Sequence, residues 1–205
     1  PDESNLGFGK KFTDHMFVMD YTEGEGWHDA RIVPYAPLQI DPAAKVLHYA
    51  QEIFEGLKAY RTDDGSIQLF RPMDNIRRMN DSAERISLPQ IPEELALAGI
   101  TELVKLERDW VPHEKDTSLY IRPFMIGLDA ALGVHSSHHC QYIVIVCPVG
   151  ALRETTHKDR VIQAINDPNK HVVVQPAPAV RVGIGECFGL PAGTCETGKL
   201  AAALH

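Results

Sequence analysis

The stretch Phe54-Glu55-Gly56-Leu57-Lys58-Ala59-Tyr60 decides the fold, because its pattern is that of a strand with two different faces. Successive side chains of a strand point to opposite faces, so the even-numbered residues share one surface, and Leu57 and Ala59 share the other. The even-numbered surface mixes aromatic side chains, a cation and a glycine. Such a mixture favours contact with an anionic ligand that has an apolar part. An ordinary two-faced strand with a solvated Lys58 is the alternative.

Turn residues and apolar segments predict the other strands. Thr62-Asp63-Asp64-Gly65-Ser66 supplies the turn of a hairpin that follows residues 54–60. Residues 141–146 are nearly all apolar, so their strand is expected in the centre of the sheet. The expected strands span residues 16–21, 27–34, 54–60, 67–70, 118–128 and 141–146.

Two segments have the periodicity of helices. Within residues 72–87 the apolar residues are spaced by three, four and three: Ile76, Met79, Ala83 and Ile86. A second helix is expected to open after Pro92 and to end before Pro112. Strands and helices come in runs rather than in strict alternation. This order predicts an α+β fold, with a mixed or antiparallel sheet of about six strands and two long helices packed on it.

Three arginines call for a partner. Arg77 and Arg78 are expected in the first turn of the helix over residues 72–87, where cations oppose the helix dipole. A bound phosphate would explain them, and a solvated surface pair is the alternative. Arg122 lies among apolar residues of an expected strand, and a buried guanidinium needs an anion. A ligand and an intramolecular salt bridge to a glutamate both satisfy that need.

Composition bounds the class of protein. The chain has 205 residues, enough for one domain or little more, and 44% of them are hydrophobic. With 20 basic and 28 acidic residues, the net charge of -8 gives no general reason to bind nucleic acid. No stretch reaches the ~20 apolar residues of a membrane span. The four cysteines form no C-x-x-C pair, so we expect a reducing, cytoplasmic location.

Six motifs, taken together, resemble branched-chain amino acid aminotransferases. They are Gly9-Lys10-Lys11-Phe12-Thr13-Asp14-His15-Met16, Leu47-His48-Tyr49, the stretch over residues 54–60, Leu69-Phe70-Arg71-Pro72, Tyr120-Ile121-Arg122-Pro123 and Leu132-Gly133-Val134. This family comprises pyridoxal-phosphate enzymes of fold type IV, the D-amino-acid aminotransferase-like fold. The resemblance runs from about Asn5 to Ala151 and covers the family's N-terminal small domain.

The resemblance implies roles for particular residues. Arg78 would contact the phosphate of pyridoxal 5'-phosphate. Phe8, Tyr49, Phe54 and Tyr120 would wall a pocket for an aliphatic side chain. Arg122 would fix that pocket, Lys58 would assist in carboxylate recognition, and Val134 would lie on a loop that closes over the site. The implied reaction moves nitrogen from leucine, isoleucine or valine to 2-oxoglutarate in a homodimeric enzyme of branched-chain amino acid biosynthesis.

Beyond Ala151 the chain departs from that family. Transamination needs a lysine that forms a Schiff base with the cofactor. Lys158 and Lys170 lie in polar stretches that are typical of loops, and Lys199 opens a segment that is typical of a vector-derived tag. We therefore assign no catalytic residue.

We expect a small domain over residues 1–151, an atypical tail over 152–198 that replaces or truncates the large domain, and tag residues over 199–205. The tail lacks helical periodicity, and only residues 171–174 and 180–184 are expected as short strands. The alternative functional interpretation is a non-catalytic, truncated module that dimerises or binds small anions. A lyase or a D-amino-acid enzyme on the same fold is a further alternative.

Two other motifs have weaker support. Gly193-Thr194-Cys195-Glu196-Thr197-Gly198-Lys199 has the spacing of a phosphate-binding loop, but Leu200 stands where such a loop needs Ser or Thr. His135, His138, His139 and Cys140 crowd one segment without the regular spacing of a structural zinc site. An exposed linker loop is the favoured interpretation, and no metal ligand is assigned.

Overall fold

The structure is a computed structural model that describes residues 6–114, 117–150 and 158–173. The chain divides into two compact units, Pro1–Leu152 and Arg153–His205. The first unit holds all the strands of the described ranges, and the second holds one helix. The two units are described separately.

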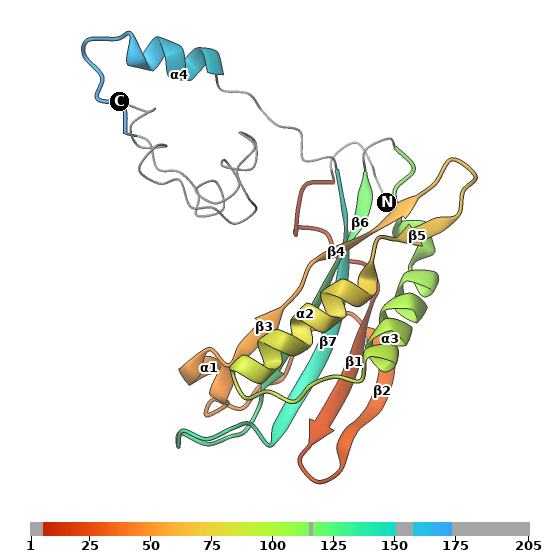
Figure 1. The fold of residues 1–205 in the computed structure, drawn as a ribbon. Helices are drawn as coiled ribbons and strands as arrows, with labels where there is room; N and C mark the ends of the chain where they lie inside the picture. The colour runs from red at the N-terminus through yellow and green to blue at the C-terminus, as the bar shows by residue number, and fades with distance from the viewer. Residues whose placement is uncertain (1–5, 115–116, 151–157, 174–205) are drawn as a thin grey trace, which may run out of the picture. The chain divides into compact units, whose positions relative to one another are not determined.

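The first unit is an antiparallel sheet with two long helices on one face (Figure 1). Its order is β2-β1-β7-β6-β4-β5, and β3 also pairs with β6. The strands are β1 (His15–Thr22), β2 (Gly26–Pro34), β3 (Glu52–Phe54), β4 (Leu57–Arg61), β5 (Ile67–Leu69), β6 (Ser118–Gly127) and β7 (His139–Val149). The predicted α+β class is confirmed, and so is the central place of the apolar strand, since β7 lies between β1 and β6.

The stretch that was expected to form one strand is divided into β3 and β4. Both segments keep one register against β6, with Phe54 opposite Phe124 and Leu57 opposite Ile121. Between them the Glu55 N–H donates to the Pro123 carbonyl oxygen at 2.9 Å. Proline has no N–H to return that bond, so the ladder is interrupted there. The alternation of exposed and buried side chains continues through the break, as predicted.

Two long helices cover one face of the sheet. Helices α2 (Pro72–Arg85) and α3 (Glu93–Leu106) lie side by side on it, and a short 3₁₀ turn, Arg108–Trp110, follows α3 (Figure 1). Their apolar residues pack on the buried side chains of β4, β6 and β7. The approach of α3 is close, because a Cβ atom on Gly99 would lie 2.6 Å from Cζ of Phe17. In the described ranges, no helix has the length and apolar character that a membrane crossing demands.

The opposite face of the sheet has a smaller apolar cluster. It is built from Met16, Val18, Ile126 and Ile143, with Phe124 and Ile145 packed beside them. The short helix α1 (Lys45–Tyr49) adds Val46 to this cluster. Over the rest of this face, the side chains of β3, β4 and β6 are partly or fully exposed. Most of the predicted site residues lie here.

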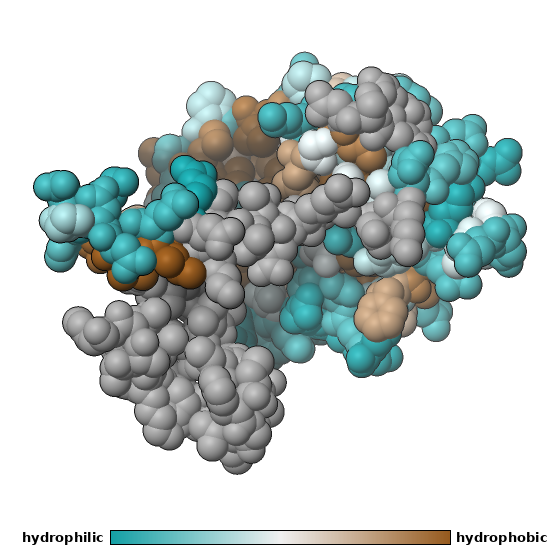
Figure 2. Space-filling model, turned by 90° about the horizontal axis from the view of Figure 1, so that it is seen from above, coloured by the Kyte–Doolittle hydropathy of each residue, from teal (hydrophilic) through white to brown (hydrophobic). Residues whose placement is uncertain are grey.

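The described part of the second unit corrects two predictions. Helix α4 (Lys158–Ile165) lies in the tail, where no helix was expected, and residues 171–173 are not a strand. With eight residues, α4 is too short to display a clear period in the sequence. Its apolar residues Val161, Ile162 and Ile165 are exposed, and apolar surface adjoins hydrophilic surface on α4 in Figure 2. Val174 and the other expected strand, 180–184, lie outside the described residues.

Candidate functional site

Arg122 on β6 is held between two aromatic side chains. Its Nε and Nη2 atoms donate to the hydroxyl oxygen of Tyr120 at 3.0 and 2.8 Å. Its guanidinium carbon lies 4.2 Å from the ring centroid of Phe54, within the range of a cation–π contact. Tyr120 and Arg122 share a face because they are two residues apart on one strand. The sequence left an anionic ligand and a glutamate open as partners of Arg122, and in the structure its guanidinium contacts these two aromatic side chains.

Phe8, from the segment before β1, covers Tyr120. The two rings meet edge to face with centroids 5.1 Å apart. Beside them is a cavity of about 150 Å³, here called the Tyr120 hollow. Its lining residues are Phe8, Gly9, Phe12, Tyr120, Arg122, Ile145, Val146 and Cys147. The structure thus brings together Phe8, Phe54, Tyr120 and Arg122, four of the predicted site residues.

Gly56 and Lys58 border the same group. A Cβ atom on Gly56 would lie 2.5 Å from the Tyr120 hydroxyl oxygen, so only glycine leaves room for this tyrosine. Lys58 on β4 is directly opposite Tyr120 in the register of the sheet. Cross-strand partners point to the same face, so Lys58 projects on the side of Tyr120 and Arg122.

Arg78 pairs with Glu55, a residue that was not predicted to belong to the site. The Nε and Nη2 atoms of Arg78 donate to the two carboxylate oxygens of Glu55 at 2.7 and 2.6 Å, and Asn75 donates to the same carboxylate at 3.0 Å. Burial opposes the charged form of Glu55, but the hydrogen bonds from Arg78 and Asn75 outweigh it, so the pKa of Glu55 lies below its ordinary value. Glu55 is 9% exposed in its side chain, whereas Arg78 is 64% exposed.

The arginines of α2 do not lie where they were expected. Helix α2 begins at Pro72, which puts Arg77 and Arg78 in its second turn. Their conflict with the helix dipole is therefore weaker than the sequence suggested, since that effect fades beyond the first turn. Arg77 forms an ion pair with Glu93 of α3 at 3.2 Å. Of these two arginines, Arg78 is the one that contacts the Phe54-Glu55-Gly56 segment.

Tyr49 and Val134 meet at a separate cavity. The hydroxyl of Tyr49 donates to the carbonyl oxygen of Leu132, which ties α1 to the segment that carries Val134. The cavity has about 420 Å³ and is here called the Val134 hollow. Its lining residues are Lys45, Tyr49, Ala50, Gln51, Ile86, Ser87, Val134, His135 and Ser136. In the described residues, Tyr49 lines the Val134 hollow and Tyr120 lines the Tyr120 hollow.

A sequence signal for Glu55 did exist. Glu55 falls on the buried side of the alternation in the Phe54 stretch, where an unpaired carboxylate would be costly. A buried acid needs a cationic partner, and the nearby helix offers Arg78.

The lysines of the tail were expected in loops. Lys158 lies in α4 rather than in a loop, and Lys170 pairs with Asp167 at 3.1 Å. Lys199 and the phosphate-loop motif lie outside the described residues.

A larger groove, of about 810 Å³, lies elsewhere, between the β4–β5 hairpin and the end of α3. Arg61 lines it, and Nη2 of Arg61 donates to the carbonyl oxygens of Arg108 and Val111 at 2.8 and 3.0 Å. These bonds tie the hairpin to the end of α3, which is a structural task. The residues that line this groove include none of the predicted site residues, so the opposite face remains the candidate site.

Comparison with known proteins agrees with the motifs. No family model matches the chain. The chain is 60% identical over 151 residues to branched-chain-amino-acid transaminase 1 of Bacillus subtilis (strain 168), which covers 74% of this chain and 42% of the relative. It is 50% identical over 203 residues to a probable branched-chain-amino-acid aminotransferase of Staphylococcus aureus (strain N315), which covers 98% of this chain and 53% of the relative.

Among solved structures, the chain is similar to the branched-chain aminotransferase of the thermophilic archaeon Thermoproteus uzoniensis with norvaline. The TM-score is 0.49 at 22% identity, over 66% of this chain and 41% of that one. The chain spans about half the length of the curated relatives it matches. By its sequence identity to those relatives, the matched part of the chain belongs to the branched-chain amino acid aminotransferase family.

Proposed function

We propose that this chain supplies one half of the site of a pyridoxal-phosphate-dependent aminotransferase that acts on leucine, isoleucine and valine with 2-oxoglutarate. Residues 1–151 would be the small domain, and the other half of the site would come from a large domain beyond them. One observation carries the proposal: Arg78 and Arg122 are both held in place around the Phe54-Glu55-Gly56 segment. The high identity to named aminotransferases supports the reaction type.

Arg78 is suited to the phosphate of the cofactor. A guanidinium has five N–H donors, and Glu55 accepts from two of them, so three remain for phosphate oxygens. The Glu55 carboxylate fixes the side chain but also cancels its charge. We therefore propose that phosphate binding needs further donors, such as helix N–H groups, from residues beyond 151.

Arg122 is suited to a substrate carboxylate. Two of its donors go to the Tyr120 hydroxyl, and the others are left for an anion. Phe8, Phe54 and Tyr120 offer apolar surface next to this cation, and Lys58 is close across the strand. An apolar surface of this kind selects aliphatic side chains, but it distinguishes single methylenes only weakly.

The Tyr120 hollow needs a second wall. Its volume of about 150 Å³ is below the roughly 300–1,000 Å³ of small-molecule sites. We propose that the large domain provides that wall. We also propose that the segment with Val134 closes over the ligand and that its contact with Tyr49 serves as the hinge. Under this proposal the Tyr120 hollow and the Val134 hollow border one ligand in the completed enzyme.

When bound, pyridoxal phosphate serves as the electron sink for a negative charge on the substrate α-carbon. The residues of this chain hold the phosphate and the carboxylate and keep water from the aliphatic side chain. The lysine that carries the cofactor and moves the proton would lie in the large domain. We further propose that the complete enzyme is a cytoplasmic homodimer. The match to the Staphylococcus aureus relative covers 98% of this chain, so it extends through the tail and does not support the expectation of an unrelated tail or of tag residues.

A chimaeric enzyme tests the proposal. Residues 1–151 would be fused to the part of the Bacillus subtilis transaminase 1 that follows the matched region, and leucine transamination would be measured. We expect activity that falls at least about tenfold in Arg78→Ala and Arg122→Ala, because each removes a charged contact. Arg77→Ala is the matched control, since Arg77 pairs with Glu93. An active chimaera that tolerates both losses contradicts the assigned roles.

The unaltered chain gives a second readout. Mixed with pyridoxal phosphate, it is expected to show no band near ~420 nm that borohydride fixes onto a lysine. Such a band would mean that the chain carries its own cofactor lysine. Phosphate binding without any transamination in the chimaera would favour the non-catalytic module. A preference for D-alanine or aminodeoxychorismate over leucine would point to the related enzyme classes.

A further inference from the structure

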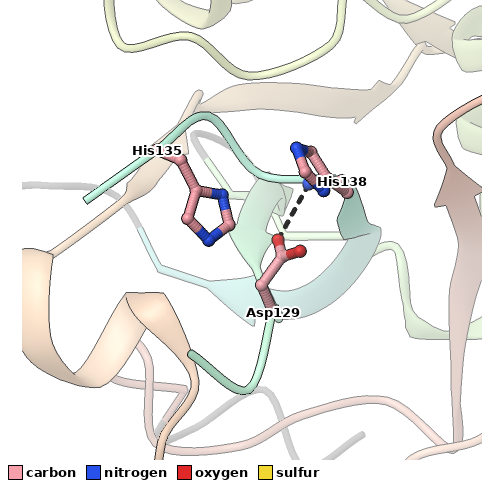
Figure 3. Close-up of side chains that lie close together, drawn as sticks. All are labelled: Asp129, His135 and His138. Atoms are coloured by element: carbon pink, nitrogen blue, oxygen red, sulfur yellow. Dashed lines mark hydrogen bonds between the residues drawn. The ribbon is translucent and has the colours of Figure 1, made fainter. Parts of the chain in front are cut away.

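The segment between β6 and β7 brings one carboxylate and two imidazoles together. Asp129 follows the end of β6, and His135 and His138 precede β7 (Figure 3). One ligand atom from each side chain lies within 4.8 Å of the others. We propose that Asp129, His135 and His138 form a binding site for a divalent transition metal ion, with Zn²⁺ as the best match. None of its ligands is a residue that we propose for the cofactor phosphate or the substrate carboxylate, although His135 also lines the Val134 hollow.

The distances suit a zinc ion after a small adjustment. Zinc binds nitrogen and oxygen at about 2.0–2.2 Å, which places tetrahedral ligands about 3.3 Å apart. The three ligand atoms are already within 4.8 Å, so a closure of roughly 1.5 Å or less is required. His135 is exposed and His138 is half-exposed, so both rings can turn without disturbing the core.

His135 presents the correct nitrogen to a metal. Its Nδ1 atom lies 2.7 Å from the carbonyl oxygen of Ser136, which can only accept. Nδ1 must therefore carry the proton, and in the neutral ring Nε2 keeps its lone pair. A hydrogen bond of this kind from the second ring nitrogen is the arrangement that orients most histidine ligands of metals.

Asp129 is held in place by two backbone hydrogen bonds. Its Oδ2 atom accepts from the backbone N–H groups of His138 and His139 at 2.9 and 3.2 Å. A carboxylate has about four acceptor sites, so positions remain for an ion.

Neighbouring groups set the charge around the site. Oε2 of Glu23, in the β1–β2 turn, lies 3.6 Å from Nε2 of His138. The Glu23 N–H also donates to the His138 carbonyl oxygen at 2.8 Å, which fixes the turn beside the site. The ammonium of Lys45 donates to the His135 carbonyl oxygen and opposes a cation. Two carboxylates, Asp129 and Glu23, outweigh that one positive charge.

The sequence motif includes two of the proposed ligands, His135 and His138, and two residues outside the cluster. Cys140 is 2% exposed, and its side chain is not among the clustered side chains. His139 begins β7 and is not among the clustered side chains. The motif did not include Asp129, which lies six residues before His135. An ion held here would restrain the segment that carries Val134.

Metal titration of the full chain tests the site. The metal-free chain would be titrated with Zn²⁺ by calorimetry and with Co²⁺ by visible absorption, which reports tetrahedral coordination. The chain has 10 histidines, so the measurement is a difference between variants. We expect wild type to bind one more equivalent than His135→Gln and His138→Gln, or to bind it at least about tenfold more tightly. His139→Gln is the matched control and keeps the site.

Circular dichroism checks that each variant folds, and hydrogen exchange gives a local readout. Zn²⁺ is expected to slow exchange over residues 129–139 in wild type and in His139→Gln, but not in His135→Gln. Equal stoichiometry and affinity in wild type and in both ligand variants would overturn the proposal. Loss of the ion in His139→Gln to the same extent would also overturn the assignment.

Discussion

Arg78 of α2 grips the carboxylate of Glu55 with two parallel hydrogen bonds, Nε to Oε1 at 2.7 Å and Nη2 to Oε2 at 2.6 Å. The bond joins a helix to the segment between β3 and β4. It also sets the direction of the guanidinium that we propose for phosphate binding. A side chain that is 64% exposed would otherwise sample many rotamers. The buried Glu55 carboxylate therefore orients the exposed Arg78 guanidinium.

Replacement of Glu55 by glutamine should lower the free energy of unfolding at neutral pH by about 1–3 kcal/mol, because charge-assisted bonds are lost from a buried site. The pKa of Glu55 is lowered in the folded state, so its contribution is present above the ordinary value of 4.5 and is lost as the pH falls through the folded pKa. Below about pH 4.5 the difference between wild type and Glu55→Gln should therefore shrink. Urea unfolding at several pH values measures it.

Glu52→Gln is the control for that experiment, because Glu52 lies on β3 and is exposed. It should leave stability nearly unchanged. A pH-independent gap between wild type and Glu55→Gln would contradict an ionised Glu55.

Gly56→Ala should distort the Tyr120–Arg122 pair. The new Cβ would lie 2.5 Å from the Tyr120 hydroxyl oxygen and 3.1 Å from its Cζ, and such overpacking costs about 1–3 kcal/mol. Adding Tyr120→Phe should restore part of the stability, since the nearest clash disappears. Thermal unfolding measures both effects. Gly133→Ala, where the nearest atom is 3.9 Å away, is the control, and an equal loss there would argue against the steric explanation.

Gly99→Ala has two opposing effects on stability, one from helix propensity and one from packing. Alanine in place of glycine favours a helix by about 1 kcal/mol. At this position, however, the Cβ would lie 2.6–2.9 Å from three ring atoms of Phe17, a clash of about 1–3 kcal/mol. We expect net destabilisation in chemical denaturation, relieved by Phe17→Leu. As a control, Ala98→Gly at the exposed neighbouring position should cost about 1 kcal/mol by propensity alone. A more stable Gly99→Ala would show that α3 can move away from β1.

The thiols of Cys140 and Cys147 should react slowly with a disulfide reagent at neutral pH. Burial raises the pKa of both, to about 12 for Cys140, so little thiolate forms in the folded state. The measurement needs a Cys187→Ser/Cys195→Ser background, which leaves these two thiols alone. Phe8→Ala should speed the reaction of Cys147, which lines the Tyr120 hollow with Phe8, but not that of Cys140. Equal acceleration of both thiols would indicate general loosening rather than an opened hollow.

Local patterns were sufficient for most of the fold. The apolar run of β7 indicated a central strand, and the spacing of Ile76, Met79 and Ala83 indicated the buried side of α2. The interruption between β3 and β4 was not predictable from that stretch, because its cause, Pro123, belongs to the partner strand. Short α4 escaped detection for lack of repeated turns.

The candidate site was only partly predictable for a related reason. Alternation along one strand places Tyr120 and Arg122 together without any knowledge of the fold. The pairing of Arg78 with Glu55 depends on how α2 crosses the sheet, which no local pattern encodes. The separation of Tyr49 from Tyr120 depends likewise on the path of α1.

The pairing of β1 with β7 has a consequence for synthesis. β7 joins the first hairpin to β6, and its last residue is Val149. During translation β1 can pair with β7 only after more than a hundred further residues have left the ribosome, and until then the edge of β1 stays unpaired. Contacts so distant along the chain slow folding, and the nascent hairpin is open to association with other chains in that interval.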